Sequence, residues 1–149
     1  MRLAHLSALP MLALALAACD SEAEREADAT EDGIEQQADA SAAAAGGAIA
    51  ALGLTETQLL DADLVAADGT DLGDVEQVRR DASGAVSGLL VEVEDSNPDR
   101  YVVVPLTGLT TVVRGDDTDL QATMTAADLA ALPDAALDAS ASPAATPAG

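Results

Sequence analysis

The chain has 149 residues, with 27 acidic residues against six arginines and no lysine. This charge balance repels nucleic-acid phosphates, and one tyrosine offers too little aromatic surface for base stacking, so we expect no nucleic-acid partner. His5, the only histidine, lies in the N-terminal apolar stretch, which argues against histidine-based catalysis and His/Cys zinc sites, so we expect no enzymatic activity and no cofactor.

Residues 1–18 have the features of a secretory signal. Arg2 precedes an apolar run of leucine and alanine, which is shorter than the roughly 20 residues that span a bilayer. The run ends in Leu16, Ala17, Ala18 and Cys19, and these four residues resemble the lipobox of bacterial lipoproteins. The resemblance implies cleavage before Cys19 and a diacylglyceryl group on its sulfur, which would tether the chain to a membrane on the extracytoplasmic side of the cell envelope.

Cys19 is the only cysteine in the sequence, so a disulfide within the chain is excluded. Asp20 follows it and resembles the inner-membrane retention signal of enteric lipoproteins. This rule differs between bacterial lineages, so the choice between the inner and the outer membrane stays open.

Residues 19–53 form an acidic and alanine-rich stretch, of which residues 20–39 alone carry nine acids and one arginine. Low hydrophobicity and high charge cannot offset the entropy cost of ordering, so we predict a disordered linker that holds the domain off an anionic lipid surface. A helix around Ser21–Ala29 is the alternative structure, and a specific acidic binding tail is the alternative role.

Residues 54–134 carry the larger apolar side chains and the signals of regular structure. A capping box at Thr55 and Gln58 predicts a short helix through Leu60. A second cap at Thr125 predicts another short helix that ends before Pro133. Between them, hydrophobic runs and turn residues predict strands over 64–67, 75–80, 85–94, 100–106, 110–114 and 120–124. The valine-rich run over 100–106 is expected to be buried on both faces, and residues 135–149 are expected to be a disordered tail.

Six short strands joined by hairpin turns in a single domain predict an all-β fold. We expect a small antiparallel barrel of about six strands with short flanking helices. Closure of the barrel would remove the exposed edges that favour aggregation.

The order and spacing of the turns also carry a family resemblance. Val65–Val75 contains an apolar strand, Asp-Gly and then Gly-Asp-Val, and a second Asp-x-x-Gly-x-Val turn follows within Arg80–Val86. With the valine-proline strand end at Val102–Leu106, they resemble the PRC-barrel family over about Ala62–Met124. The resemblance implies a small all-β barrel that acts as a docking or assembly module. The family's frequent glycine-rich insertion is replaced here by the loop Asp95–Asp99, so a partner that uses the insertion is not implied.

Asp68, Asp71 and Asp74 crowd one turn and are the candidate ligands for a divalent cation, because hard cations prefer several carboxylate oxygens. Aspartates also belong in turns because they accept hydrogen bonds from nearby backbone amides, and the sequence lacks the EF-hand pattern. We favour the turn interpretation and expect no metal site. An acidic, cation-binding envelope protein is the alternative function.

Three further residues are candidates for contact with a partner. Arg79 and Arg80 are the only adjacent positive charges, and on a strand they would point to opposite faces. We expect them to pair with neighbouring acids at the surface, with contact to a partner as the alternative. Tyr101 is expected in the core or rim of the barrel with its hydroxyl toward water. The predicted function is a non-catalytic, lipid-anchored envelope protein whose barrel binds an unidentified envelope protein.

Overall fold

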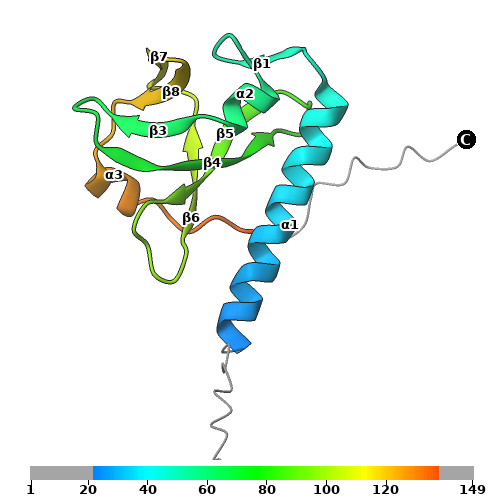
Figure 1. Ribbon diagram of the computed structural model, residues 1–149, viewed down its shortest axis with the longest axis vertical. Helices are drawn as coiled ribbons and strands as arrows, with labels where there is room; N and C mark the ends of the chain where they lie inside the picture. The colour runs from blue at the N-terminus through cyan, green and yellow to red at the C-terminus, as the bar shows by residue number, and fades with distance from the viewer. Residues whose placement is uncertain (1–21, 138–149) are drawn as a thin grey trace, which may run out of the picture.

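The structure is a computed structural model and describes residues 22–137 (Figure 1). Over these residues the fold is mostly β, with one six-stranded sheet, a small two-stranded sheet and three helices. The helices are α1 (Glu22–Ala45), α2 (Glu56–Leu60) and α3 (Ala126–Ala130). The strands are β1 (Ile49–Ala51), β2 (Leu54–Thr55), β3 (Asp63–Ala66), β4 (Asp71–Arg80), β5 (Val86–Val93), β6 (Tyr101–Pro105), β7 (Leu109–Arg114) and β8 (Asp117–Ala122).

Both predicted helix caps are confirmed, and each is a capping box. The Thr55 hydroxyl accepts from the Gln58 N–H at 3.2 Å, and the Gln58 side chain accepts from the Thr55 N–H at 3.0 Å. Thr125 and Asp128 exchange the equivalent pair of hydrogen bonds at 3.2 and 2.9 Å. Because these bonds satisfy amides that have no partner inside the helix, α2 and α3 begin where the sequence predicts.

The predicted strands are also present, with ends shifted by a few residues. Asp68 and Asp81 accept hydrogen bonds from backbone amides in the β3–β4 and β4–β5 turns, which explains why the chain reverses there. Gly115 and Asp116 alone separate β7 from β8.

The prediction of a closed, all-antiparallel barrel is wrong. The sheet has the order β6-β5-β4-β3-β8-β7 and keeps two edges, β6 and β7. β3 pairs in parallel with β8, with Leu64 opposite Leu120. β4 already occupies one side of β3, so the β7–β8 hairpin joins the sheet on the other side. Turn residues indicate which strands are joined by a hairpin, but they do not indicate this pairing between distant strands.

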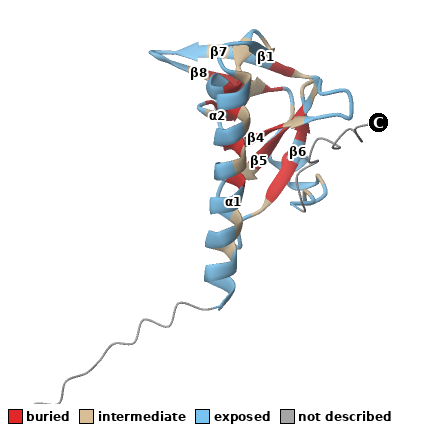
Figure 2. Cartoon of the chain, turned by 90° about the vertical axis from the view of Figure 1, so that its right-hand side faces the viewer, coloured by how far each residue is buried: buried red, intermediate tan, exposed pale blue. Residues whose placement is uncertain are grey.

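The prediction of a disordered linker is wrong over residues 22–45, which form α1, and over residues 49–51, which form β1. Ile34, Ala38 and Ala42 repeat at a spacing of four and form the buried side of this helix (Figure 2). α1 packs against β4 and α2, so one apolar stripe orders a segment whose other faces are highly charged. No helix among residues 22–137 combines the length and the apolar character that a membrane span requires.

The main core lies on one face of the sheet, where α2 and α3 contribute Leu59 and Leu129. The opposite face carries a smaller cluster beneath α1, formed by Ile34, Leu90 and Tyr101. β6 is therefore buried only in part, since Val103 is 42% exposed, and the prediction of burial on both faces is wrong for this residue. The buried residues of the main core are Leu59, Ala62, Leu64, Ala66, Leu72, Val75, Val78, Leu89, Val91, Val102, Val104, Leu109, Leu120, Ala122 and Leu129.

Candidate functional site

The predicted lipidation site Cys19 and the cleavage-site residues Leu16, Ala17 and Ala18 lie outside the described residues. α1 begins at Glu22, three residues after the cysteine, and its first five residues are exposed. Figure 1 shows this end of the helix projecting beyond the sheet. The N-terminal turns of α1 thus lie between the predicted lipid attachment and the domain.

Carboxylates gather where α1 meets the outer face of the sheet. Glu76 on β4 is half-buried, and its burial is the largest cause that raises its pKa to about 7. Repulsion from Glu92 on β5, from Asp74, and from Glu35 and Glu31 on α1 raises this pKa further. The interface therefore holds one carboxyl group that takes up a proton near neutral pH, although its neighbours are acids.

Tyr101 lies inside this interface. It is 6% exposed and belongs to the cluster with Ile34 and Leu90, which confirms the expectation of a core or rim position. Its hydroxyl lies near Glu92, where the sequence suggested contact with water. Burial and the nearby charge of Glu92 raise the pKa of Tyr101, so its hydroxyl stays protonated and can donate.

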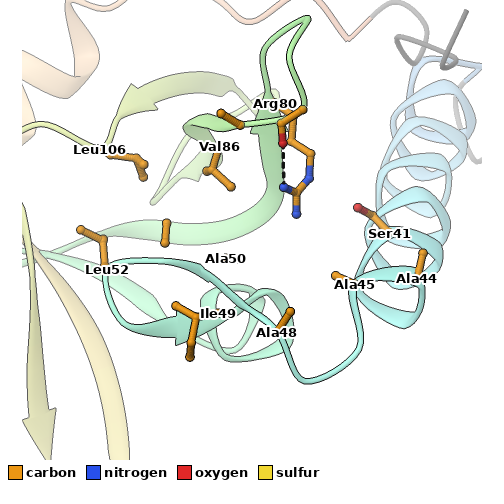
Figure 3. A pocket seen from close by; sticks show the side chains of 13 residues that line it. Ser41, Ala44, Ala45, Ala48, Ile49, Ala50, Leu52, Arg80, Val86 and Leu106 are labelled. Carbon is orange, nitrogen blue, oxygen red and sulfur yellow. Dashed lines mark hydrogen bonds between the residues drawn. The ribbon is translucent and has the colours of Figure 1, made fainter.

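Arg80 stands at the rim of a surface groove of about 730 Å³ (Figure 3). The groove lies between the C-terminal end of α1 and β5, and residues 48–52 form its floor. Arg80 Nη1 donates to the Gly84 carbonyl at 3.1 Å, and Nη2 pairs with Glu56 Oε2 at 2.5 Å. The ion pair expected for Arg80 is present, but its acid is fully buried in α2. Glu56 Oε1 has no hydrogen-bond partner among the described residues.

Arg79 points away from Arg80 and contacts residues 130–137 at the end of the described chain, called the C-terminal segment below. Its Nη2 donates to the Ala136 carbonyl at 3.2 Å, while its Nε is buried without a hydrogen-bond partner in the described part of the chain. Both arginines therefore contact groups of this chain.

Two aspartates of the β3–β4 region accept hydrogen bonds from backbone amides. Asp68 accepts from the Thr70 N–H at 3.0 Å, which lowers the pKa of Asp68, and Asp71 accepts from the Gly73 N–H at 3.1 Å. Asp74 lies on β4 opposite Asp63, and partial burial together with this neighbour raises the pKa of Asp63. Among residues 22–137, no group of three or more His, Cys, Asp or Glu side chains could hold a metal ion.

Sequence reasoning missed Arg100, which joins the C-terminal segment to the sheet. Its Nε pairs with Asp134 Oδ1 at 2.5 Å, and its Nη1 donates to the Ala130 carbonyl at 3.0 Å. Nη2 donates to the Leu132 carbonyl. Arg100 directly precedes β6 and follows a turn, and this position gave no signal for contacts with residues about 30 positions later.

Sequence reasoning also missed Glu56 and Glu76. Glu56 follows the cap residue Thr55, where an acid is common for its effect on the helix end alone, so its burial was not indicated. One signal in the sequence could have indicated Glu76. It is a charged residue between Val75 and the buried Gln77, in a strand that is otherwise well buried.

No model of a known protein family matches the chain, and no curated protein is similar to it in sequence.

Proposed function

We propose that the chain is a lipid-anchored protein of the bacterial cell envelope, and that its mostly β domain is a non-catalytic module for binding or assembly. The observation that carries the proposal is a complete lipobox, Leu16–Cys19, placed three residues before a helix that docks on the domain. A lipid on Cys19 would then connect to the sheet through α1 directly.

α1 acts as a strut between the membrane and the sheet. The rise of an α-helix places Glu22 about 18 Å from Ile34, the first buried residue of the helix. A docked helix keeps this separation, whereas a flexible linker would let the domain move toward the lipid surface. The acids Glu22, Glu24 and Glu26 lie on the exposed turns, and anionic lipid headgroups repel them.

One feature supports a binding role for the domain. The turns within Val65–Val86 and the strand end at Val102–Leu106 resemble those of the PRC-barrel family, which implies a docking or assembly module. The arginines add no support for it, because Arg79, Arg80 and Arg100 hold segments of the fold together. We assign these three arginines a structural role.

Cell fractionation of the full chain tests the anchor. The unmodified sequence is expected in the membrane fraction and should be extracted only by detergent. Cys19→Ser should release the chain into the soluble extracytoplasmic fraction, because the sulfur that carries the lipid is gone. The double variant Cys19→Ser/Ser21→Cys keeps a thiol two residues away and is expected to be soluble as well. Membrane attachment of either variant that resists high salt would overturn the proposal.

A further inference from the structure

The two edges of the six-stranded sheet differ in how far they are protected from pairing with another strand. At β6, Pro105 lacks a backbone donor, and the C-terminal segment covers the opposite end of the strand. Val102 bridges to Asp134, and the Ala135 N–H donates to the Tyr101 carbonyl at 2.7 Å. Arg100 fixes that segment, so β6 is closed to another strand over this part of its length.

β7 has none of these protections among the described residues. It contains no proline, and its register with β8 is unbroken from Leu109 to Arg114. It forms the end of the strand order, so no described strand pairs with its outer side. Such an edge presents backbone donors and acceptors to any extended chain that can approach it.

The hydrogen-bond pattern shows which residues of β7 face outward. The Thr123 N–H donates to the Gly108 carbonyl at 3.0 Å, which fixes the alternation along the antiparallel β7–β8 pair. The backbone groups of Thr111 and Val113 then point away from β8. Leu109 has the same orientation, but its N–H already donates to the Leu106 carbonyl at 3.2 Å. Thr111 and Val113 are thus the two residues of β7 whose backbone N–H and C=O are both available to a strand of another chain.

The side chains of this edge favour the same contact. Val113 lies on the same face of the sheet as the buried Leu109, because it is four positions further along the strand. It is nevertheless 71% exposed, the highest value among the large hydrophobic residues that the structure describes. Among residues 22–137 no element covers Val113, so the core face continues uncovered to the edge of the sheet.

We propose that a second copy of this chain docks on β7, in an antiparallel β7–β7 pairing centred on Val112. This register places Thr111 of one copy opposite Val113 of the other, so that the two pairs of outward backbone groups bond to each other. It also packs the exposed Val113 side chain beside Thr111 of the second copy. The pairing extends the sheet continuously through two domains.

The absence of negative charge on β7 favours this edge, rather than another surface, as the place where two copies of the chain meet. β7 carries no carboxylate and one arginine, Arg114, in a chain with 27 acidic residues. In the Val112-centred register, Arg114 stands opposite Thr110 of the second copy, and no carboxylate of one β7 strand faces a carboxylate of the other. Two copies of this acidic chain thus meet here with little local repulsion. The remaining repulsion between the two molecules is screened by salt, so association increases with ionic strength.

Strand pairing over the five residues Thr110–Arg114 covers less than the 1,200–2,000 Å² typical of stable interfaces, so the dimer is weak in solution. Confinement to one membrane raises the effective concentration and favours pairing. Only this confinement to a membrane rests on the proposed function, and the strand pairing itself does not depend on it.

Disulfide trapping tests the register. In the full chain with Cys19→Ser, Val112→Cys places the only thiol at the twofold centre, where facing Cα atoms are close enough for a disulfide. Thr110→Cys is the matched control on the same face of β7, and its two thiols would be about 13 Å apart along the paired strands. Circular dichroism confirms that both variants are folded, and non-reducing electrophoresis after mild oxidation measures the dimer.

We expect a disulfide dimer for Val112→Cys that increases with protein concentration and with salt, and at least about tenfold less for Thr110→Cys. Adding Val113→Lys to Val112→Cys should abolish the dimer, whereas Val103→Lys, at the exposed valine of β6, should leave it. Equal trapping at positions 110 and 112, or none at high concentration and high salt, would overturn the proposal. Because Cys19 is absent from these variants, the result is independent of lipid attachment and of its test.

Discussion

Glu56 and Arg80 form an ion pair in which the Glu56 side chain is fully buried and the Arg80 side chain is 34% exposed. The two groups therefore differ in what happens when the partner is lost. An arginine without Glu56 can still reach water, whereas a Glu56 carboxylate without Arg80 remains in the interior.

This asymmetry predicts unequal costs for the two substitutions. Arg80→Met should lower the free energy of unfolding by about 3 kcal/mol, because it leaves a buried carboxylate without its partner. Glu56→Gln should lower it by about 1 kcal/mol, because the amide still accepts from Arg80. Urea unfolding at neutral pH measures both, and Arg25→Met on the exposed end of α1 is the control with no expected effect. Equal losses for the two variants would contradict this description of the pair.

The raised pKa of Glu76 predicts how stability changes with pH. The folded carboxyl keeps its proton up to a pH of about 7, while the unfolded chain loses it near its ordinary value of 4.5. This group therefore lowers stability progressively as the pH rises through that window, and the loss is complete above it. Glu76→Gln should be more stable than the unmodified chain at pH 8, by about 1 kcal/mol for this partly exposed site.

The measurement is the midpoint of thermal unfolding at mildly acidic pH and at pH 8. The advantage of Glu76→Gln should be present at pH 8 and absent near pH 4. The same substitution at the exposed Glu26 of α1 is the matched control and should give no such gain. An advantage of Glu76→Gln that is equal at both pH values would argue against the raised pKa.

Substitution of two glycines by alanine should change the stability in opposite directions. Gly73 has φ +143°, and a Cβ there would lie 1.8 Å from the Glu92 carbonyl oxygen. Gly73→Ala should thus destabilise the domain by about 3 kcal/mol or more. Gly33 lies within α1 with nothing within 4 Å of its added Cβ, so Gly33→Ala should stabilise by about 0.5–1 kcal/mol. Denaturant unfolding measures both changes. A loss of stability for Gly33→Ala would speak against a docked helix.

Arg100 predicts how tightly the C-terminal segment is held. Arg100→Lys cannot reproduce the three hydrogen bonds of the guanidinium and should cost about 1–2 kcal/mol. The Ala135 amide, which bonds to Tyr101, should then exchange with solvent faster. Arg114→Lys on β7 is the control, and the Ala135 exchange rate should not change. Unchanged exchange in Arg100→Lys would show that the segment is held by other contacts.

Local signals in the sequence predicted local structure well. The cap residues Thr55 and Thr125 set the starts of α2 and α3, and the aspartates of the β-turns set the hairpins. These features depend on neighbouring residues, which the sequence shows directly. The lipobox, the resemblance to the PRC-barrel family and the binding role remain predictions.

Features that depend on packing were not predicted. α1 was expected to be disordered because its acids dominate the composition, while the three small or aliphatic residues that order it, Ile34, Ala38 and Ala42, contribute little to that average. The parallel pairing of β3 with β8 joins strands that no turn connects. The partner of Arg80 was expected at the surface, and only the position of α2 against β4 reveals that it is buried.

Intact and peptide mass spectrometry of the chain isolated from bacterial membranes tests the central claim most directly. We predict an N-terminal peptide that begins at Cys19 and carries a diacylglyceryl group on the sulfur, with residues 1–18 removed. A peptide that begins at Met1, with an unmodified thiol at Cys19, would contradict the account.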